Sequence, residues 1–140
     1  MEVSSHALVQ GRVDLIDFST AVFTNLTSDH LDYHKTHDNY FAAKSILFKN
    51  LSSDANSVIN VDDTYGRKLF SKTQSKITTY GIERNADIQA KDIELDITGT
   101  RFKIVTQDAE VVIRTKLVGL YNVYNILAAC GACLVEGVTL

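Results

Sequence analysis

Three clusters of polar residues have the types and spacing that catalytic or binding chemistry requires. The first spans Glu2–His6 and places a carboxylate, two hydroxyls and an imidazole within five positions at the start of the sequence. Polar residues at the carboxyl end of a strand in an open α/β sheet usually face a ligand crevice. A solvated chain terminus explains the same residues without any function. The composition of this segment leaves both interpretations open.

The second cluster is the polar segment from Asn25 to His34. It contains two carboxylates, Asp29 and Asp32, and two histidines, His30 and His34. Oxygen ligands together with a histidine suit magnesium or manganese, whereas zinc usually takes more nitrogen or sulfur. The alternative is a polar loop that caps the next helix. The segment contains no strict metal motif that would decide between these two interpretations.

The third candidate is a single residue, Lys44, within a predicted helix. Residues three or four positions apart touch on a helix surface. For Lys44, these neighbours are Tyr40, Phe41, Leu47 and Phe48. Lys44 is therefore expected away from the solvated face that carries Ser45 and Lys49. Such a lysine either extends its ammonium to water or has a lowered pKa. In the second case its amine is nucleophilic and can take up carbon dioxide as a carbamate, an anion able to hold a metal.

Two features near the end of the sequence also carry polar or reactive groups. Asn122 and Asn125 lie at the start of a predicted helix. Capping explains one asparagine, while a pair can present amides to a planar polar ligand such as adenine. Cys130 and Cys133 match the Cys-x-x-Cys pattern but fall inside that helix, away from the N-terminus where a helix dipole lowers a thiol pKa. We interpret them as small core residues. No glycine-rich phosphate loop occurs in the sequence.

The elements that must position these residues follow from hydrophobic periodicity. Buried strands are predicted over Phe18–Leu26, Asn56–Val61 and Lys76–Tyr80. Helices are predicted between them, over Asp38–Leu51 and from Asp62 through Lys72. Asp38 or Asn39 is expected to cap the first of these helices, and Asp62-Asp63-Thr64 offers capping groups for the second. This alternation of strands and helices predicts parallel strands joined by crossover helices.

The pattern changes near Ile82. Apolar residues then alternate with charged ones on both sides of Thr98-Gly99-Thr100, which predicts a hairpin with one buried face. The apolar residues are Ile93, Leu95, Ile97, Phe102 and Ile104. A third strand over Val111–Leu117 and an amphipathic helix over Asn122–Val135 follow. The apolar stripe of that helix contains Val123, Ile126, Leu127, Cys130 and Leu134. The predicted fold class is α/β, with a mainly parallel sheet flanked by helices and a small antiparallel sheet.

Composition sets the broad class. The 140 residues are 45% hydrophobic and 22% charged, which fits one globular domain. The net charge of −3 comes with no basic stripe, so a nucleic-acid partner is not expected. No apolar run is long enough to span a bilayer, and the first residues lack the pattern of a signal peptide. We therefore expect a cytoplasmic protein without a membrane partner.

Taken together, these clusters resemble the Mur ligases, and most closely those members that add a diamino acid to the muramoyl dipeptide. The segments Met1–Arg12, Val22–His34 and Tyr40–Lys44 look like signatures of that family. Gly119–Asn125, followed by Ala128 and Ala129, resembles its late motif. The motifs also occur in the family's order, which makes the resemblance far more specific than any one motif.

The resemblance implies an ATP-dependent ligase of peptidoglycan precursor synthesis. ATP would phosphorylate the carboxylate of UDP-N-acetylmuramoyl-L-alanyl-D-glutamate, and a diamino acid, meso-diaminopimelate or L-lysine, would attack the acyl phosphate. Magnesium charge would bring the anionic partners together. The implied catalytic and metal-binding residues are Glu2, His30 and a carbamoylated Lys44. The implied dipeptide contacts are Ser4 and Arg12, and the residues implied near the adenine are Asn122 and Asn125.

The resemblance also sets expectations about domain organisation. Residues 1–140 would be part of the central ATP-binding domain, without the uridine-binding domain, the phosphate loop or the C-terminal domain. We expect such a fragment to be inactive alone and to self-associate through a sheet edge left unpaired beside Val3. One alternative is another ligase of the superfamily, of the folate-peptide or D-glutamate-adding type, which the segment His30–His34 disfavours. The other is a catalytically dead module that keeps the fold.

Overall fold

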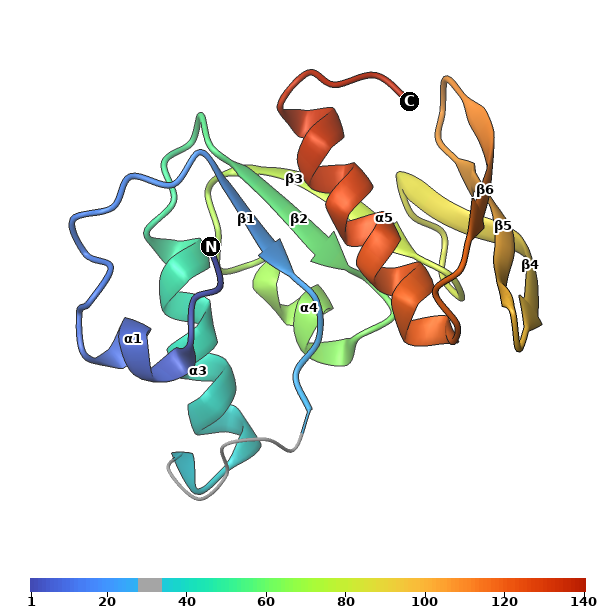
Figure 1. The fold of residues 1–140 in the computed structure, drawn as a ribbon. Coiled ribbons are helices and arrows are strands. Elements are labelled where there is room, and N and C mark those ends of the chain that lie inside the picture. The colour runs from blue at the N-terminus through green and yellow to red at the C-terminus, as the bar shows by residue number, and fades with distance from the viewer. Residues whose placement is uncertain (28–33) are drawn as a thin grey trace.

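In the part of the chain that the structure describes, six strands form one continuous sheet in the order β1-β2-β3-β4-β5-β6 (Figure 1). The computed structural model describes residues 1–27 and 34–140. Strands β1 to β4 pair in parallel, and β4, β5 and β6 pair antiparallel. The strands are β1 Thr20–Phe23, β2 Asn56–Asn60, β3 Lys76–Gly81, β4 Ile88–Asp96, β5 Gly99–Val105 and β6 Glu110–Thr115. The α/β class with parallel and antiparallel parts is confirmed.

The antiparallel strands extend the parallel sheet and do not form a separate small one. The junction is short, since only Tyr80 and Gly81 of β3 pair with Ile88 and Gln89 of β4. At the opposite edge, β1 pairs with β2 alone among the strands of the described residues. The expected unpaired edge is therefore present, but β1 forms it, and residues 1–4 lie in neither a helix nor a strand.

Helices cover both faces of the sheet (Figure 1). Helices α1, Ser5–Val9, and α3, His37–Lys49, pack against each other. Helices α3 and α4, Thr64–Leu69, lie over one face, and α5, Leu120–Val135, lies over the other. Within the described residues, none of the helices has both the length and the apolar character needed to cross a membrane.

Two apolar cores result, because successive strand residues point to opposite faces. Phe23 and Ile59 pack under α3 and α4. Val58 and Tyr80 pack under α5, and Phe102 of β5 joins the same cluster. Phe102 and Tyr80 are both fully buried. A single core beneath α5 therefore connects the parallel and antiparallel strands.

Helix α3 begins and ends slightly earlier than predicted. Thr36 caps it in place of Asp38 or Asn39, because Thr36 has extended backbone and its hydroxyl accepts the N–H of Asn39 at 3.2 Å. Ser45, expected on the solvated face, is buried. Its hydroxyl donates to the carbonyl of Phe41 at 2.7 Å, so the helix backbone itself satisfies the buried group.

Strand β1 is shorter than the apolar run Phe18–Leu26 suggests. After Phe23, side chains of the β2 end replace ladder hydrogen bonds. Asn60 Nδ2 donates to the carbonyl of Thr24 at 2.8 Å, and the N–H of Leu26 donates to Asp63 at 3.1 Å. Helix α4 also ends early, at Leu69 instead of Lys72. The hydrogen bonds of Asn60 and Asp63 set where β1 ends, and the periodicity of apolar residues does not reveal them.

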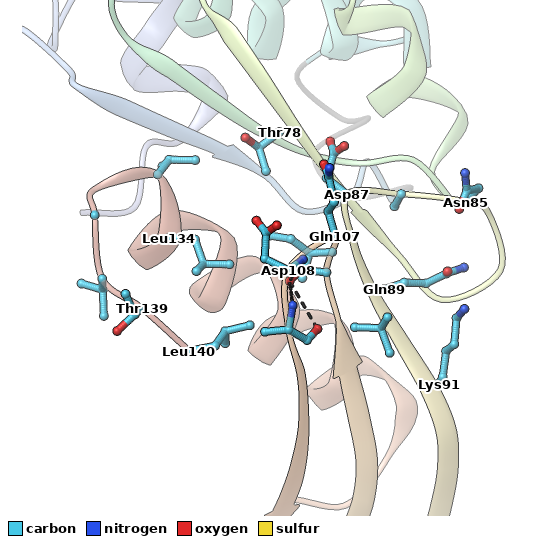
Figure 2. A pocket seen from close by; sticks show the side chains of 18 residues that line it. Thr78, Asn85, Asp87, Gln89, Lys91, Gln107, Asp108, Leu134, Thr139 and Leu140 are labelled. Carbon is cyan, nitrogen blue, oxygen red and sulfur yellow. Dashed lines mark hydrogen bonds between the residues drawn. The ribbon is translucent and has the colours of Figure 1, made fainter.

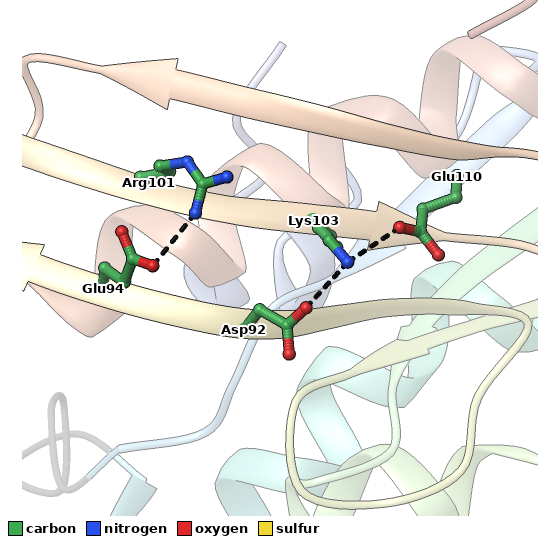
Figure 3. A network of polar contacts seen from close by, with 5 residues as sticks. All are labelled: Asp92, Glu94, Arg101, Lys103 and Glu110. Atoms are coloured by element: carbon green, nitrogen blue, oxygen red, sulfur yellow. Dashed lines mark hydrogen bonds and ion pairs between the residues drawn. The ribbon is translucent and has the colours of Figure 1, made fainter.

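The hairpin of β4 and β5 forms as predicted, but the prediction that all of its apolar residues are buried is wrong. Phe102 and Ile104 are buried, whereas Leu95 and Ile97 are largely exposed. A bulge between Lys91 and Glu94 places Leu95 opposite Thr100, on the same face as Phe102 but near the tip of the hairpin, and Ile97 lies in the turn between β4 and β5. Neither side chain belongs to the core cluster beneath α5. The outer face carries ion pairs: Lys103 Nζ lies 2.9 Å from Asp92 and 3.0 Å from Glu110, and Arg101 lies 2.9 Å from Glu94 (Figure 3).

Candidate active site

Lys44 lies half-buried in the middle of α3, as its apolar neighbours on the helix predict. Its Nζ donates to the carbonyl of Val3 at 3.3 Å and lies 6.0 Å from the centre of the Tyr40 ring. Burial lowers the pKa of the Lys44 ammonium below its ordinary value, and the negative charge of Glu2 opposes that shift. The amine is thus more often unprotonated than that of a solvated lysine.

A cavity of about 530 Å³ opens beside Lys44 along the free edge of β1. Glu2 and Val3 line it on one side, and Ala132 and Glu136 at the end of α5 line it on the other. Glu136 accepts hydrogen bonds from the hydroxyls of Ser19 at 3.0 Å and Thr20 at 2.5 Å. These bonds lower the pKa of the Glu136 carboxyl. The cavity therefore presents carboxylates and one partly desolvated amine beside open strand backbone.

Ser4 and Arg12 frame helix α1. The Ser4 hydroxyl accepts the N–H of Ala7 at 3.1 Å and so caps the helix. Arg12 is exposed in the turn after the helix. Both side chains are accessible to a ligand, and no described contact joins them to Lys44.

His30, Asp29 and Asp32 lie outside the described residues. His34 is buried, with Nε2 at 2.8 Å from the hydroxyl of Ser5. Its ring stacks on Tyr40 at 5.1 Å between centroids. His34 therefore connects the first and second polar clusters. Within residues 1–27 and 34–140, no three histidine, cysteine, aspartate or glutamate side chains converge as metal ligands.

The end of β2 carries polar residues that sequence reasoning treated only as helix caps. Asp62 accepts the N–H groups of Ile82 at 2.6 Å, Glu83 at 3.0 Å and Arg84 at 2.8 Å, and the hydroxyl of Tyr124 at 2.9 Å. Burial acts to raise the pKa of the Asp62 carboxyl, but these hydrogen bonds together hold it below its ordinary value. Helix capping needs one aspartate, and the sequence has two in succession, Asp62 and Asp63. The additional aspartate is the feature of the sequence that could have indicated this cluster.

Asn122 and Asn125 lie near the start of α5, at the same end of the sheet. Asn122 Nδ2 donates to the carbonyl of Val118 at 2.9 Å, and Asn125 is exposed. Tyr124, between them, reaches Asp62 at the carboxyl end of β2. The first turns of α5 therefore lie at the edge where the parallel strands end, which is the usual position of ligands in open α/β sheets.

Neither of the other two chemical features belongs to this site. Cys130 and Cys133 are unpaired, and burial together with the neighbouring thiol raises the pKa of Cys130, which argues against a redox pair. A larger cavity of about 890 Å³ lies near the other end of α5, between Leu134, Asp87 and Gln107 (Figure 2). Among the described residues that line it there is neither a histidine nor a cysteine, so we assign the chemistry to the Lys44 side.

The residues around Lys44 fit a magnesium site of the kind the resemblance implies. A carbamate on Lys44 would add an oxygen anion within a cavity that Glu2 already lines. Oxygen anions are the ligands that magnesium prefers. The lowered pKa of Lys44 favours the neutral amine that carbon dioxide requires.

Comparisons with known proteins identify the family of this chain. The sequence profile described as the Mur ligase middle domain matches residues 1–133. The UDP-N-acetylmuramoyl-L-alanyl-D-glutamate–2,6-diaminopimelate ligase of Clostridium botulinum is 47% identical over 140 residues, covering 100% of this chain and 28% of that protein. A solved structure of a ligase of the same name has a TM-score of 0.88 at 36% identity, covering 99% of this chain and 29% of that one.

A more distant structure shares the fold. The MurF ligase from Thermotoga maritima, solved in complex with ADP, has a TM-score of 0.80 at 20% identity and covers 92% of this chain and 30% of that one. The chain thus spans only 28% to 30% of the length of these relatives.

Proposed function

Because this chain belongs to the Mur ligase middle-domain family, we propose that it supplies the central catalytic domain of an ATP-dependent ligase of peptidoglycan precursor synthesis. The ligase joins a diamino acid to UDP-N-acetylmuramoyl-L-alanyl-D-glutamate. The observation that carries the proposal is Lys44, a half-buried lysine with a lowered pKa that lines the same cavity as Glu2. The names of the two diaminopimelate-adding relatives favour meso-diaminopimelate over L-lysine as the incoming amino acid.

In this proposal ATP transfers its terminal phosphoryl group to the substrate carboxylate. The amine of the diamino acid then attacks the acyl phosphate, an amide bond forms and phosphate leaves. Magnesium bound near Glu2, His30 and a carbamoylated Lys44 would neutralise the charge where the anionic reactants meet. Arg12 suits the anionic dipeptide because its planar guanidinium binds a carboxylate or phosphate in two places. Ser4, at the start of α1, offers an exposed hydroxyl to the same substrate.

Asn122 and Asn125 are the proposed adenine contacts. Their amides lie near the N-terminal end of α5, on the edge of the sheet where the parallel strands end. An amide offers both a donor and an acceptor to the edge of a purine ring. A protein with these nucleotide-linked substrates would act in the cytoplasm, where such precursors and ATP are available.

The test of the proposed function is activity of the longer ligase that carries this domain, with Lys44→Ala. We expect about a hundredfold loss or more, because removing a group that stabilises developing charge costs at least that much. Short carboxylic acids should restore part of the activity by occupying the place of the carbamate. Lys49→Ala is the matched control, since Lys49 is an exposed lysine of the same helix. Unchanged activity in Lys44→Ala would remove the catalytic assignment.

We also propose that this 140-residue chain is inactive by itself and self-associates through β1. The supporting observation is that β1 is an edge strand with a cavity along its open side. Light scattering over a range of concentrations should show a rising average mass. Val22→Lys, an outward charge on β1 where Val22 is already partly exposed, should reduce it. A concentration-independent monomer would contradict this proposal.

A further inference from the structure

Helix α1 carries both of the proposed dipeptide contacts but is too short to hold its own position. It contains only the five residues Ser5–Val9, and helices of this length are unstable in isolation. Ser4 caps its first turn, and the backbone N–H of Arg12 donates to the carbonyl of Ala7 at 2.9 Å. Helix α1 lies against α3 (Figure 1). The positions of Ser4 and Arg12 therefore depend on what fastens α1 to α3.

A buried hydrogen bond fastens the first turn of α1. Ser5, the first residue of the helix, is fully buried, and its hydroxyl lies 2.8 Å from Nε2 of His34, which is also buried. Either atom can donate, depending on the tautomer of the ring. Because Ser4 already caps the helix, the hydroxyl of Ser5 is not needed for capping. A buried hydroxyl destabilises a fold unless it is hydrogen-bonded, and His34 supplies that bond.

His34 is itself fixed to the start of α3. Its carbonyl accepts the backbone N–H of Thr36 at 2.8 Å and the side-chain amide of Asn39 at 3.0 Å. Its ring stacks on that of Tyr40 with an interplanar angle of 18°. Tyr40 precedes Lys44 by about one helical turn, and Lys44 Nζ lies 6.0 Å from the centre of the same ring. The imidazole therefore connects α1 to the part of α3 that carries Lys44.

A second contact lies on the other side of Ser4. Lys44 Nζ donates to the carbonyl of Val3 at 3.3 Å. Val3 and Ser5, the residues before and after Ser4, are thus both held from the α3 side, while the Ser4 side chain stays exposed. In the proposed function Lys44 is carbamoylated, which changes the nitrogen that donates. Of these two contacts, only the one between Ser5 and His34 is independent of that change.

We propose that Ser5 and His34 are positioning residues for the muramoyl dipeptide. Their buried hydrogen bond holds α1 on α3 and so sets Ser4 and Arg12 relative to Lys44. This inference rests on the proposed function, in which Ser4 and Arg12 contact the dipeptide. Since Ser5 and His34 are both buried, they act through α1 and not by touching the substrate.

The test is the dissociation constant of UDP-N-acetylmuramoyl-L-alanyl-D-glutamate, measured by calorimetry on the longer ligase without nucleotide or added metal. Ser5→Ala and His34→Phe should each weaken dipeptide binding about tenfold, the equivalent of one hydrogen bond of about 1.4 kcal/mol. The double variant should bind no more weakly than the weaker single variant, because both substitutions remove the same bond. The dissociation constant of ADP should stay the same in all of these variants.

His34→Gln separates the hydrogen bond from the bulk of the ring. The side-chain amide of glutamine can place a nitrogen near the position of Nε2, so dipeptide binding should stay within about threefold of that of the unmodified ligase. If His34→Gln loses as much affinity as His34→Phe, the hydrogen bond is not the cause and the inference is wrong.

Ser45→Ala is the matched control. Ser45 is also a buried serine, but its hydroxyl donates to the carbonyl of Phe41 within the same helix. The variant should lower thermal stability, as Ser5→Ala does, and leave the dissociation constant of the dipeptide unchanged. If Ser5→Ala and His34→Phe behave like Ser45→Ala, the two residues serve stability alone and the inference is overturned.

Two further variants separate this inference from the proposed function. Arg12→Ala should weaken binding of the dipeptide but not of ADP, and Asn125→Ala should do the reverse. If Arg12→Ala weakens dipeptide binding while Ser5→Ala and His34→Phe do not, the inference is wrong and the proposed function stands. If Arg12→Ala leaves dipeptide binding unchanged, the contact through α1 is wrong and the inference falls with it; the Lys44 test still judges the function separately.

Discussion

Polar side chains are used differently in the parallel part of the sheet, β1 to β3, and in the antiparallel part, β4 to β6. In the parallel part they point inward and hold distant backbone. Asp63 reaches Leu26, Asn60 reaches Thr24, and the hydroxyl of Tyr80 donates to the carbonyl of Phe23 at 3.1 Å. In the antiparallel part the charged side chains of Lys103, Asp92 and Glu110 pair with one another on the outer face (Figure 3), and the buried Thr100, which donates to the carbonyl of Leu117, is the exception.

The difference predicts where a substitution has consequences beyond its own position. When an inward polar partner is lost, the remaining donor or acceptor is left without hydrogen bonds and away from water. When an outward ion-pair partner is lost, water replaces it at little cost. All of the proposed site residues that the structure describes lie outside β4, β5 and β6. The parallel part and its helices therefore carry the site, while the antiparallel part adds core and surface.

The largest effect is expected in the apolar core under α5, which both parts of the sheet share. A substitution there tests whether the two parts unfold together. Phe102→Ala removes a fully buried ring of β5 from the cluster under α5, and should cost about 3–5 kcal/mol of unfolding free energy. Urea unfolding followed by tyrosine fluorescence and by circular dichroism should still give one coincident transition. Two separate transitions would show that the antiparallel part unfolds independently of the parallel part.

Asp62→Asn should have the next largest effect. The amide keeps the shape but cannot accept all of the N–H groups that the carboxylate accepts, so we expect a loss of about 1–3 kcal/mol at neutral pH. Urea titration measures it. Glu94→Gln, which breaks an exposed ion pair with Arg101, is the control and should change stability by less than about 1 kcal/mol. Equal losses in the two variants would contradict the comparison.

The loss of stability in Asp62→Asn should also depend on pH. The pKa of Asp62 in the folded chain lies below its ordinary value of 3.8, so the unfolded chain takes up the proton first as the pH falls. The contribution is fully present well above that value and is lost as the pH falls through the folded pKa. The stability difference between the unmodified chain and Asp62→Asn should therefore be widest near pH 7 and shrink below about pH 4. A stability difference that grows as the pH falls would show that folding does not lower the pKa of Asp62.

The smallest effect is expected on the outer face of the hairpin. Lys103→Met removes the cation shared by Asp92 and Glu110, whose side chains are 58% and 54% exposed. We expect a change within about 1 kcal/mol, and a still smaller one in high salt. Thermal unfolding at low and high salt measures both. A loss as large as that of Asp62→Asn would show that outward ion pairs also organise this fold.

Periodicity predicted the elements of this fold well and their ends less well. The α/β class, the parallel order of β1, β2 and β3, and the hairpin all follow from apolar patterns that the structure confirms. The early end of β1 depends on Asn60 and Asp63, which lie more than thirty residues away in the sequence. The exposure of Leu95 depends on its position near the tip of the hairpin, beyond the residues that pack under α5. Local patterns carry no information about either of these causes.

Some features of the candidate site could be predicted from the sequence, and others could not. The environment of Lys44 was predictable, because helical spacing alone identifies its apolar neighbours. The pairing of Ser5 with His34 was not, since a hydroxyl and an imidazole in two separate polar segments show no common periodicity. Asp62 was assigned to a helix cap because local rules offer no other use for it. The roles of His30, Ser4, Arg12, Asn122 and Asn125 still depend on the resemblance and on the experiments above.

The position of α5 has a consequence for the order in which the chain folds. It is the last helix in the sequence, yet it packs on β1, β2, β3 and β4, and its end is tied to Ser19 and Thr20 through Glu136. During synthesis, Val58 and Tyr80 emerge long before Val123 and Leu127, the residues that cover them. Until α5 has been synthesised, no helix covers this apolar face of the parallel strands. We therefore expect folding of this domain to be slow and to finish with the docking of α5, as contacts between distant parts of a chain generally are late.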